Sequence, residues 1–202
     1  MCSSFESNIS GLSIFEKMQK DAAGNFILDD KFVESQKTRF RPADLISTIF
    51  PSNNNFIISN SLWGIKFDVA SKIPLIFNSR IETINSKTYW KNLFTNYRCL
   101  IPATGFFEWK TEGKKKIPQR ISLSDDNIFF FAGIYYDKPD GKLVSLITTE
   151  PNDFMKNVHN RMPVIFQSSE ALDFLKQGFD SAFELCSKNF NNLELKLEIS
   201  NY

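Results

Sequence analysis

The middle of the chain is a succession of apolar, strand-length stretches separated by turn residues, and this pattern restricts the fold more than any other feature. Residues 117–123, 128–136 and 142–148 each predict a β-strand. The segment between the last two contains Pro139 and an Asp140-Gly141 pair, which favour a tight turn. We therefore expect these three strands to pair in order as an antiparallel meander.

Short helical patterns surround the predicted sheet. Residues 14–22 have amphipathic spacing, with Ile14, Phe15 and Met18 on one side. Further helices are predicted over residues 88–94, over residues 151–158, and from a cap at Ser168 or Ser169 to near Gly178. Residues 56–58 predict a buried strand, and the alternation over residues 193–199 predicts an edge strand.

Few repeated βαβ units occur, so the pattern favours the α+β class. We expect one domain over residues 1–202, with a curved, largely antiparallel, barrel-like sheet surrounded by short helices. A 202-residue chain with 42% hydrophobic residues can bury a substantial core, and we find no linker in it.

Composition also bounds the partners and the location. Apolar runs stay below the roughly 20 residues that span a bilayer, and the N-terminus lacks a secretory pattern, so we expect a cytoplasmic protein without membrane contact. Cys2, Cys99 and Cys186 are too few for a zinc site or a disulfide framework, and we assign Cys99 and Cys186 to the core. No metal or cofactor is expected, and we expect a monomer. The net charge of +1 means that any affinity for a polyanion must be local.

One carboxylate lies inside the apolar run from Arg98 to Lys110. Alternation along a strand places Glu108 on the same face as Phe106, opposite Phe107 and Trp109. Partial burial would raise the pKa of Glu108 toward the range in which a carboxyl group exchanges protons near neutral pH. The alternative is an ion pair with Arg98 or Lys110 at a strand edge.

Cys2 directly follows the initiator Met1, and its small side chain permits removal of that methionine. Removal would expose a 1,2-aminothiol. With an aldehyde, the amine forms an imine and the thiol then closes a five-membered thiazolidine ring. The α-amine has a pKa of about 7.7 to 8.0 and the thiol about 8.5, so modest tuning would make both nucleophilic near neutral pH. A cysteine in the second position is also a common incidental feature.

Two further segments complete a recognisable set. They are Asn78-Ser79-Arg80-Ile81-Glu82 and His159-Asn160-Arg161-Met162-Pro163, the second of which contains the single histidine of the chain. Together with Cys2 and the segment around Glu108, they resemble the SRAP family of SOS response-associated peptidases or abasic-site processing proteins. The resemblance extends from Cys2 to about Phe166.

The resemblance implies a substrate and a catalytic set. Proteins of this family trap the ring-opened aldehyde of abasic sites in single-stranded DNA through the terminal cysteine. Cys2 would form the thiazolidine crosslink, Asn78 would orient its amine, and Glu108 would shuttle protons during imine formation and crosslink reversal. His159 would exchange protons with the opened sugar near the 3′ phosphate. The resemblance also implies lyase activity and autocatalytic removal of Met1.

DNA contacts are implied at further positions. Arg80 and Arg161 would bind flanking phosphates, and Glu82 would hold an arginine in place. Trp63 and Trp109 could stack on unpaired bases, although the core is the competing interpretation for both. The residues themselves add Arg39 and Arg41, which bracket an aromatic in an extended segment and could equally belong to a plain surface strand.

The chain departs from the family pattern at several points. Ser3 and Ser4 replace the usual Gly-Arg, which removes a phosphate contact, and Ser79 replaces an alanine. Two alternative functions stay open: a peptidase using Cys2 and His159 on other peptides, and a non-covalent module that binds single-stranded nucleic acid.

Overall fold

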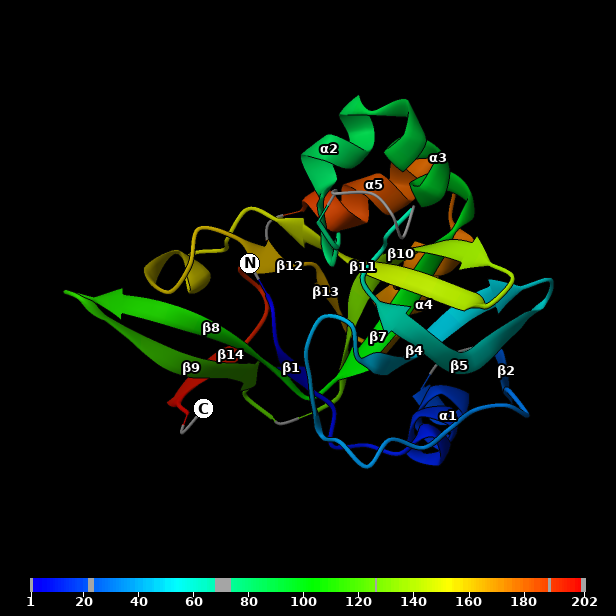
Figure 1. Ribbon diagram of the computed structural model, residues 1–202, viewed down its shortest axis with the longest axis horizontal. Helices are drawn as coiled ribbons and strands as arrows, with labels where there is room; N and C mark the ends of the chain where they lie inside the picture. Colours follow the sequence, from blue (N-terminus) through cyan, green and yellow to red (C-terminus); the bar gives the residue numbers. More distant parts are fainter. Residues whose placement is uncertain (1, 22–23, 68–73, 126, 189, 201–202) are drawn as a thin grey trace.

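A closed five-stranded β-barrel is the centre of the protein (Figure 1). The computed structural model describes residues 2–21, 24–67, 74–125, 127–188 and 190–200. The barrel strands are β4 (Leu45–Ser52), β5 (Asn55–Trp63), β7 (Arg98–Ala103), β10 (Phe129–Lys138) and β11 (Gly141–Thr149). Each pairs with the next around a circle in the order β4, β5, β11, β10, β7 and back to β4. The β5–β11 pair is parallel and the other four are antiparallel, so the predicted barrel-like α+β fold is confirmed.

Short strands extend the barrel wall on its outside. They are β2 (Asn25–Leu28) beside β5, β6 (Asn78–Arg80) and β12 (Met162–Pro163) beside β11, and β13 (Ile165–Phe166) beside β10. The predicted turn between β10 and β11 is present, with Lys138 paired to Gly141. Gly141 has φ +129°, a conformation that favours glycine at this position.

A second sheet lies beside the barrel. Its strand order is β14 (Leu195–Ile199), β9 (Lys115–Leu123), β8 (Gly105–Glu112), β1 (Phe5–Glu6) and β3 (Arg39–Phe40). The predicted meander is therefore wrong, because β9 pairs with β8 and β14 in this sheet whereas β10 pairs with β7 in the barrel. Burial explains the exchange: β7 is buried along its whole length and β10 along most of it, while β9 begins exposed. The predicted edge strand is confirmed as β14.

Five α-helices lie around the sheets among the described residues. They are α1 (Gly11–Asp21), α2 (Ile81–Ser86), α3 (Thr88–Asn96), α4 (Ser168–Lys176) and α5 (Phe179–Ser187). The first predicted helix is confirmed as α1, although its predicted end at Ala22 lies outside the described residues. Gln167 occupies the N-cap position of α4, so Ser168 begins the helix instead of capping it.

The helix predicted over residues 151–158 is wrong. Only Met155–Asn157 forms a short 3₁₀ turn, η1, there. The side-chain oxygen of Asn152 accepts the backbone N–H of Met155 at 2.9 Å, and its amide group donates to the carbonyl of Phe190. Asn152 therefore fixes the segment as a capped turn whose end is tied to a distant part of the chain.

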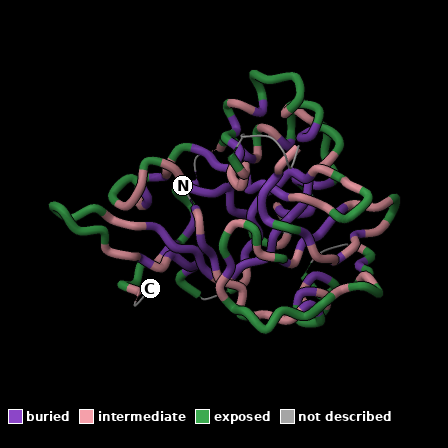
Figure 2. The backbone as a smooth tube through the Cα atoms, viewed as in Figure 1, coloured by how far each residue is buried: buried purple, intermediate pink, exposed green. Residues whose placement is uncertain are grey.

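Phe5 anchors the N-terminal strand in the hydrophobic core, which Figure 2 shows as the continuous buried centre of the molecule. Its ring lies 5.3 Å from Phe40, 5.1 Å from Trp63 and 5.6 Å from Phe131, measured between ring centroids. Burying such a side chain contributes about 1.5–3 kcal/mol. The residues that precede Phe5 are therefore held at a fixed place on the barrel, and this sets the position of Cys2.

Candidate active site

Cys2 lies three residues before the short strand β1, which is paired on both sides. Phe5 pairs with Phe106 of β8 and with Phe40 of β3. One step beyond the strand, the backbone N–H of Phe107 donates to the carbonyl of Ser4 at 2.9 Å, and the Cys2 thiol lies 3.5 Å from the same oxygen. The Cys2 side chain has no exposed surface.

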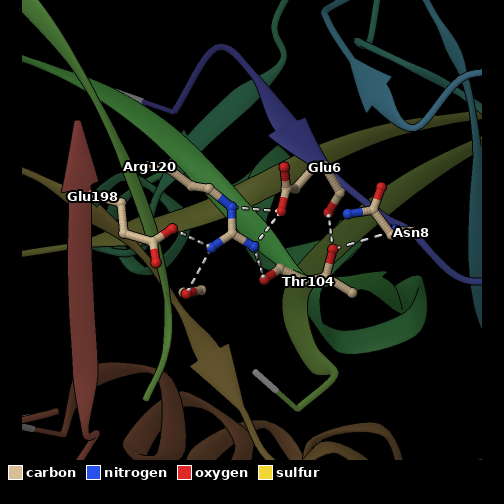
Figure 3. A network of polar contacts seen from close by, with 6 residues as sticks. Glu6, Asn8, Thr104, Arg120 and Glu198 are labelled. Carbon is tan, nitrogen blue, oxygen red and sulfur yellow. Dashed lines mark hydrogen bonds and ion pairs between the residues drawn. The ribbon is translucent and has the colours of Figure 1, made fainter. Parts of the chain in front are cut away.

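A polar network at the base of β1 reinforces this placement (Figure 3). Arg120 of β9 donates through Nε to Glu6 Oε1 at 2.7 Å, and a second guanidinium nitrogen contacts the same oxygen. Arg120 also pairs with Glu198 of β14 at 3.1 Å. Thr104 accepts the backbone N–H of Asn8 at 3.3 Å and lies 3.4 Å from the carbonyl of Glu6. Strands β9 and β14 and the residue between β7 and β8 are thus tied to the segment that follows Cys2.

Asn78 reaches Cys2 from the barrel side. β6 pairs in parallel with β11, with Asn78 opposite Leu146. The Nδ2 group of Asn78 donates to the backbone carbonyl of Cys2 at 2.7 Å. Its Oδ1 atom is buried and has no hydrogen-bond partner within the described part of the chain. A neutral amide next to the backbone of residue 2 suits the predicted orienting role, because it does not favour the charged form of a nearby amine.

Glu108 is almost fully buried on β8, with 2% of its surface exposed. Burial raises the pKa of Glu108 above its ordinary value, and the nearby His159 opposes the increase. The cations of the alternative interpretation are engaged elsewhere. Arg98 donates to the carbonyls of Phe94 and Gln177, and Lys110 pairs with Glu112 at 2.9 Å. Glu108 is therefore a desolvated carboxyl group, and the two cations of the alternative interpretation bind other groups.

His159 faces Glu108 across the site. Its Nε2 atom lies 4.0 Å from Glu108 Oε2, and about a quarter of its side chain is exposed. The backbone N–H of Arg161 donates to Nδ1 at 3.0 Å. Nδ1 also lies 3.2 Å from the carbonyl oxygen of Arg161. The turn that follows η1 therefore holds the imidazole ring with Nε2 on the side of Glu108.

The thiol of Cys2 is not poised as a thiolate. Burial, with the negative charge of Glu108 as a second cause, raises its pKa well above the ordinary range. The expectation that modest tuning gives both nucleophiles at neutral pH is thus corrected for the sulfur. A buried thiol needs a neighbouring base to remove its proton as it reacts, and Glu108 is the adjacent carboxylate.

Arg161 is held in place by Glu82, the role expected of that carboxylate. Its two terminal nitrogens donate to Glu82 Oε1 at 2.8 Å and Oε2 at 3.0 Å, and one also donates to the carbonyl of Thr148 at 2.8 Å. Burial works against ionisation of Glu82, yet the hydrogen bonds from Arg161 keep its pKa below the ordinary value. Arg80 is exposed and pairs with Thr148 in the β6–β11 pair, so it lies next to the ion pair of Arg161 and Glu82.

The two tryptophans proposed for base stacking have different environments. Trp63 is fully buried and its indole N–H donates to the carbonyl of Phe77 at 2.9 Å. A base cannot reach Trp63, so the stacking interpretation is corrected to the core interpretation for this residue. Trp109 is only partly buried and stays a candidate for contact with a base.

Arg39 and Arg41 flank Phe40 at the far edge of the second sheet. The guanidinium of Arg39 lies 4.2 Å from the centre of the Phe107 ring. The backbone N–H of Arg41 donates to Asp44 at 2.8 Å, and its side chain is exposed. Phe107 projects from the face of β8 opposite to Glu108, so Arg39 covers the other side of the strand that carries Glu108.

Sequence reasoning missed Gln119. It lies on β9 opposite Glu108 and is 3% exposed, so two buried polar side chains are cross-strand neighbours. The hairpin register offered the signal, because a turn at Gly113 places residue 119 across from residue 108. Within the described residues, no group of three or more His, Cys, Asp or Glu side chains is arranged to hold a metal ion.

The protein thus combines a closed barrel with a second sheet that holds Cys2 near a buried glutamate, an asparagine and a histidine. The family model described as SOS response associated peptidase (SRAP) matches residues 1–198, so the chain belongs to the SRAP family.

Relatives of this chain carry names from the same family. It is 35% identical over 143 residues to the abasic site processing protein YoqW of Bacillus subtilis, a match that covers 66% of this chain and 64% of YoqW. It is 31% identical over 121 residues to the abasic site processing protein YedK of Escherichia coli, covering 57% of this chain and 53% of YedK. The matched region therefore spans less than two thirds of these relatives.

Solved structures support the fold. A protein from Bacteroides thetaiotaomicron superposes with a TM-score of 0.77 at 24% identity, covering 99% of this chain and 93% of the other. A phage-related protein from Bordetella bronchiseptica gives a TM-score of 0.78 at 18% identity, covering 100% of this chain and 95% of the other. None of the described helices has the length and apolar character needed to cross a bilayer.

Proposed function

We propose that this protein forms a covalent thiazolidine crosslink between Cys2 and the aldehyde of an abasic site in single-stranded DNA. The observation that carries the proposal is the convergence of Asn78, Glu108 and His159 on residue 2. Asn78 contacts the backbone of Cys2 at 2.7 Å, and Glu108 lies close enough to raise the pKa of its thiol. The two relatives are named abasic site processing proteins, which agrees with the proposed substrate.

The chemistry begins with exposure of the amine. Hydrolysis of the peptide bond between Met1 and Cys2 adds one water and leaves a free α-amine on Cys2. That amine attacks C1′ of the ring-opened sugar, and loss of one water gives an imine. Sγ then adds to the imine carbon while its proton passes to the imine nitrogen. The net reaction converts one aldehyde and one aminothiol into one thiazolidine and one water.

The surrounding residues supply the proton transfers. Glu108, whose pKa is raised by burial, can protonate the departing hydroxyl of the first adduct and accept the thiol proton in the second step. His159 presents Nε2 on the same side and serves the opened sugar. Reversal runs through the same imine, which water hydrolyses. Removal of a C2′ proton from that imine expels the 3′ phosphate and accounts for a lyase activity.

Binding of the strand would use the cations around the site. Arg161 keeps a fixed orientation through Glu82, and Arg80 is exposed next to it. A preorganised guanidinium loses little side-chain entropy when it meets a phosphate. Arg39 and Arg41 are the corresponding candidates on the other side, and Trp109 is the candidate for stacking on an unpaired base.

An oligonucleotide with one abasic site tests the proposal. Incubation should give a covalent species that denaturing electrophoresis separates from free DNA, and Cys2→Ala should abolish it. Cys99→Ser and Cys186→Ser are matched controls that should retain it, because both thiols are buried in the core. Intact mass should show loss of Met1 from the reactive protein. Failure of wild-type protein to crosslink would refute the proposal.

The same experiment separates the alternatives. A tetrahydrofuran analogue lacks the aldehyde and should bind without crosslinking. A non-covalent module would bind both oligonucleotides equally and would be insensitive to Cys2→Ala. A general peptidase would cleave an external peptide substrate and would leave the abasic oligonucleotide without a covalent product.

A further inference from the structure

A cavity of about 420 Å³ opens along the face of the second sheet that carries Glu108. Its floor includes Lys110 of β8, Gln119 of β9 and Leu197 of β14. Its opposite wall is the segment that leads into His159, with Phe154 and Val158. In Figure 1 this segment, between β11 and β12, lies against the hairpin of β8 and β9.

The register shows that the cavity adjoins the reacting groups. Glu108 pairs with Gln119, and Gln119 pairs with Ile199 of β14. Directly paired residues project from the same face of a sheet, so the cavity floor and the Glu108 carboxyl group share one face. Val158 immediately precedes His159. The cavity is therefore lined by direct neighbours of both groups: Gln119, the cross-strand partner of Glu108, and Val158, which precedes His159.

Gln119 is a polar residue in the lining of this cavity. The residue is 3% exposed, and its Oε1 atom is buried without a hydrogen-bond partner within the described part of the chain. A buried polar atom without a partner is unfavourable, so a ligand that forms a hydrogen bond to it gains affinity. Most of the remaining lining is apolar, from Phe154, Val158 and Leu197. Flat apolar faces and a hydrogen-bonding edge are the properties of a nucleobase.

We propose that this cavity receives the nucleobase next to the abasic site and that the amide of Gln119 hydrogen-bonds to its edge. The inference rests on the proposed crosslinking function and adds to it a specificity-determining residue. The crosslinking rate then depends on which base flanks the lesion.

The experiment uses single-stranded oligonucleotides with one abasic site and with A, C, G or T on its 5′ or 3′ side. The initial crosslinking rate of the wild-type protein should vary about 3- to 10-fold with the base on one side, the effect of one hydrogen bond. Gln119→Leu should reduce this range to within about twofold. Gln167→Leu, an exposed glutamine before α4, is the control and should keep the wild-type range.

A second measurement separates binding from chemistry and from folding. Affinity for the tetrahydrofuran analogues should follow the same base order in wild type and lose it in Gln119→Leu. The melting temperature of Gln119→Leu should not fall, since leucine replaces a buried atom that lacks a partner. Equal rates with all flanking bases in wild type, or an unchanged preference in Gln119→Leu, would overturn the inference while crosslinking itself persists. Absence of any crosslink would instead refute the proposed function.

Discussion

Glu6→Ala is expected to destabilise the protein far more than Glu198→Ala, although both carboxylates pair with Arg120. Glu6 is reached by two guanidinium nitrogens and its side chain is 12% exposed, whereas Glu198 makes one contact at 3.1 Å and is 52% exposed. Removing Glu6 breaks charge-assisted hydrogen bonds in a largely desolvated place. Glu198 is screened by water.

The expected magnitudes follow from these environments. Hydrogen bonds to charged groups contribute about 1.5–3 kcal/mol, so Glu6→Ala should cost about 2–3 kcal/mol. An exposed ion pair contributes less than about 1 kcal/mol, which bounds the effect of Glu198→Ala. In a domain of this size, 1 kcal/mol shifts the melting temperature by about 2–4 °C. Glu6→Ala should therefore lower the melting temperature by about 4–12 °C, and Glu198→Ala by less than about 4 °C.

Thermal unfolding by circular dichroism, with crosslinking of an abasic oligonucleotide in parallel, measures both consequences. Because β1 carries Cys2, loosening the strand should reduce the initial crosslinking rate of Glu6→Ala at temperatures where the variant is still folded. Glu198→Ala should crosslink at the wild-type rate. Equal melting temperatures for the two variants would refute the claim that Arg120 holds the N-terminal strand in place through Glu6.

Two predictions concern the site itself. Burial raises the folded-state pKa of Glu108, so its stabilising contribution is complete below the unfolded-state pKa of about 4.3 and is lost as pH rises through the folded-state value. Glu108→Gln should thus gain melting temperature relative to wild type between pH 4 and pH 7 while crosslinking more slowly at pH 7; a large loss of stability at pH 7 would favour a structural role. Arg80→Ala should weaken DNA binding and reduce the salt dependence, lowering the slope of log K against log salt by about 1, whereas a control Lys20→Ala on α1 should leave the slope unchanged.

Local patterns in the sequence were sufficient to predict those features that depend only on neighbouring residues. The predicted strands appear as β9, β10 and β11 with small changes of boundary, and the turn at Gly141 is present because glycine permits its positive φ. Burial of Glu108 was also predictable, since it alternates with aromatic residues along one strand. Such features depend on neighbours within a few residues.

Pairing between distant segments was not predictable in the same way. The predicted meander was wrong because β9 and β10 belong to different sheets. Strand β10 is buried along most of its length and therefore pairs within the barrel. The helix before His159 failed because Asn152 bonds to Phe190, 38 residues further along the chain. Neither competing partner is visible in a window of local sequence.

The sequence by itself determined which chemical groups the protein has. They are a cysteine at position two, a carboxyl group within an apolar strand, a single histidine, and arginines close in sequence to that carboxyl group and to the histidine. Only the tertiary structure decided how they meet. Asn78 contacts a residue 76 positions away, and the β8–β9 register places Gln119 beside Glu108. Burial also decided the protonation of the Cys2 thiol and removed Trp63 from any contact with DNA. The physical reason is that desolvation and long-range contact depend on the whole packed molecule, whereas strand periodicity depends only on the neighbouring residues.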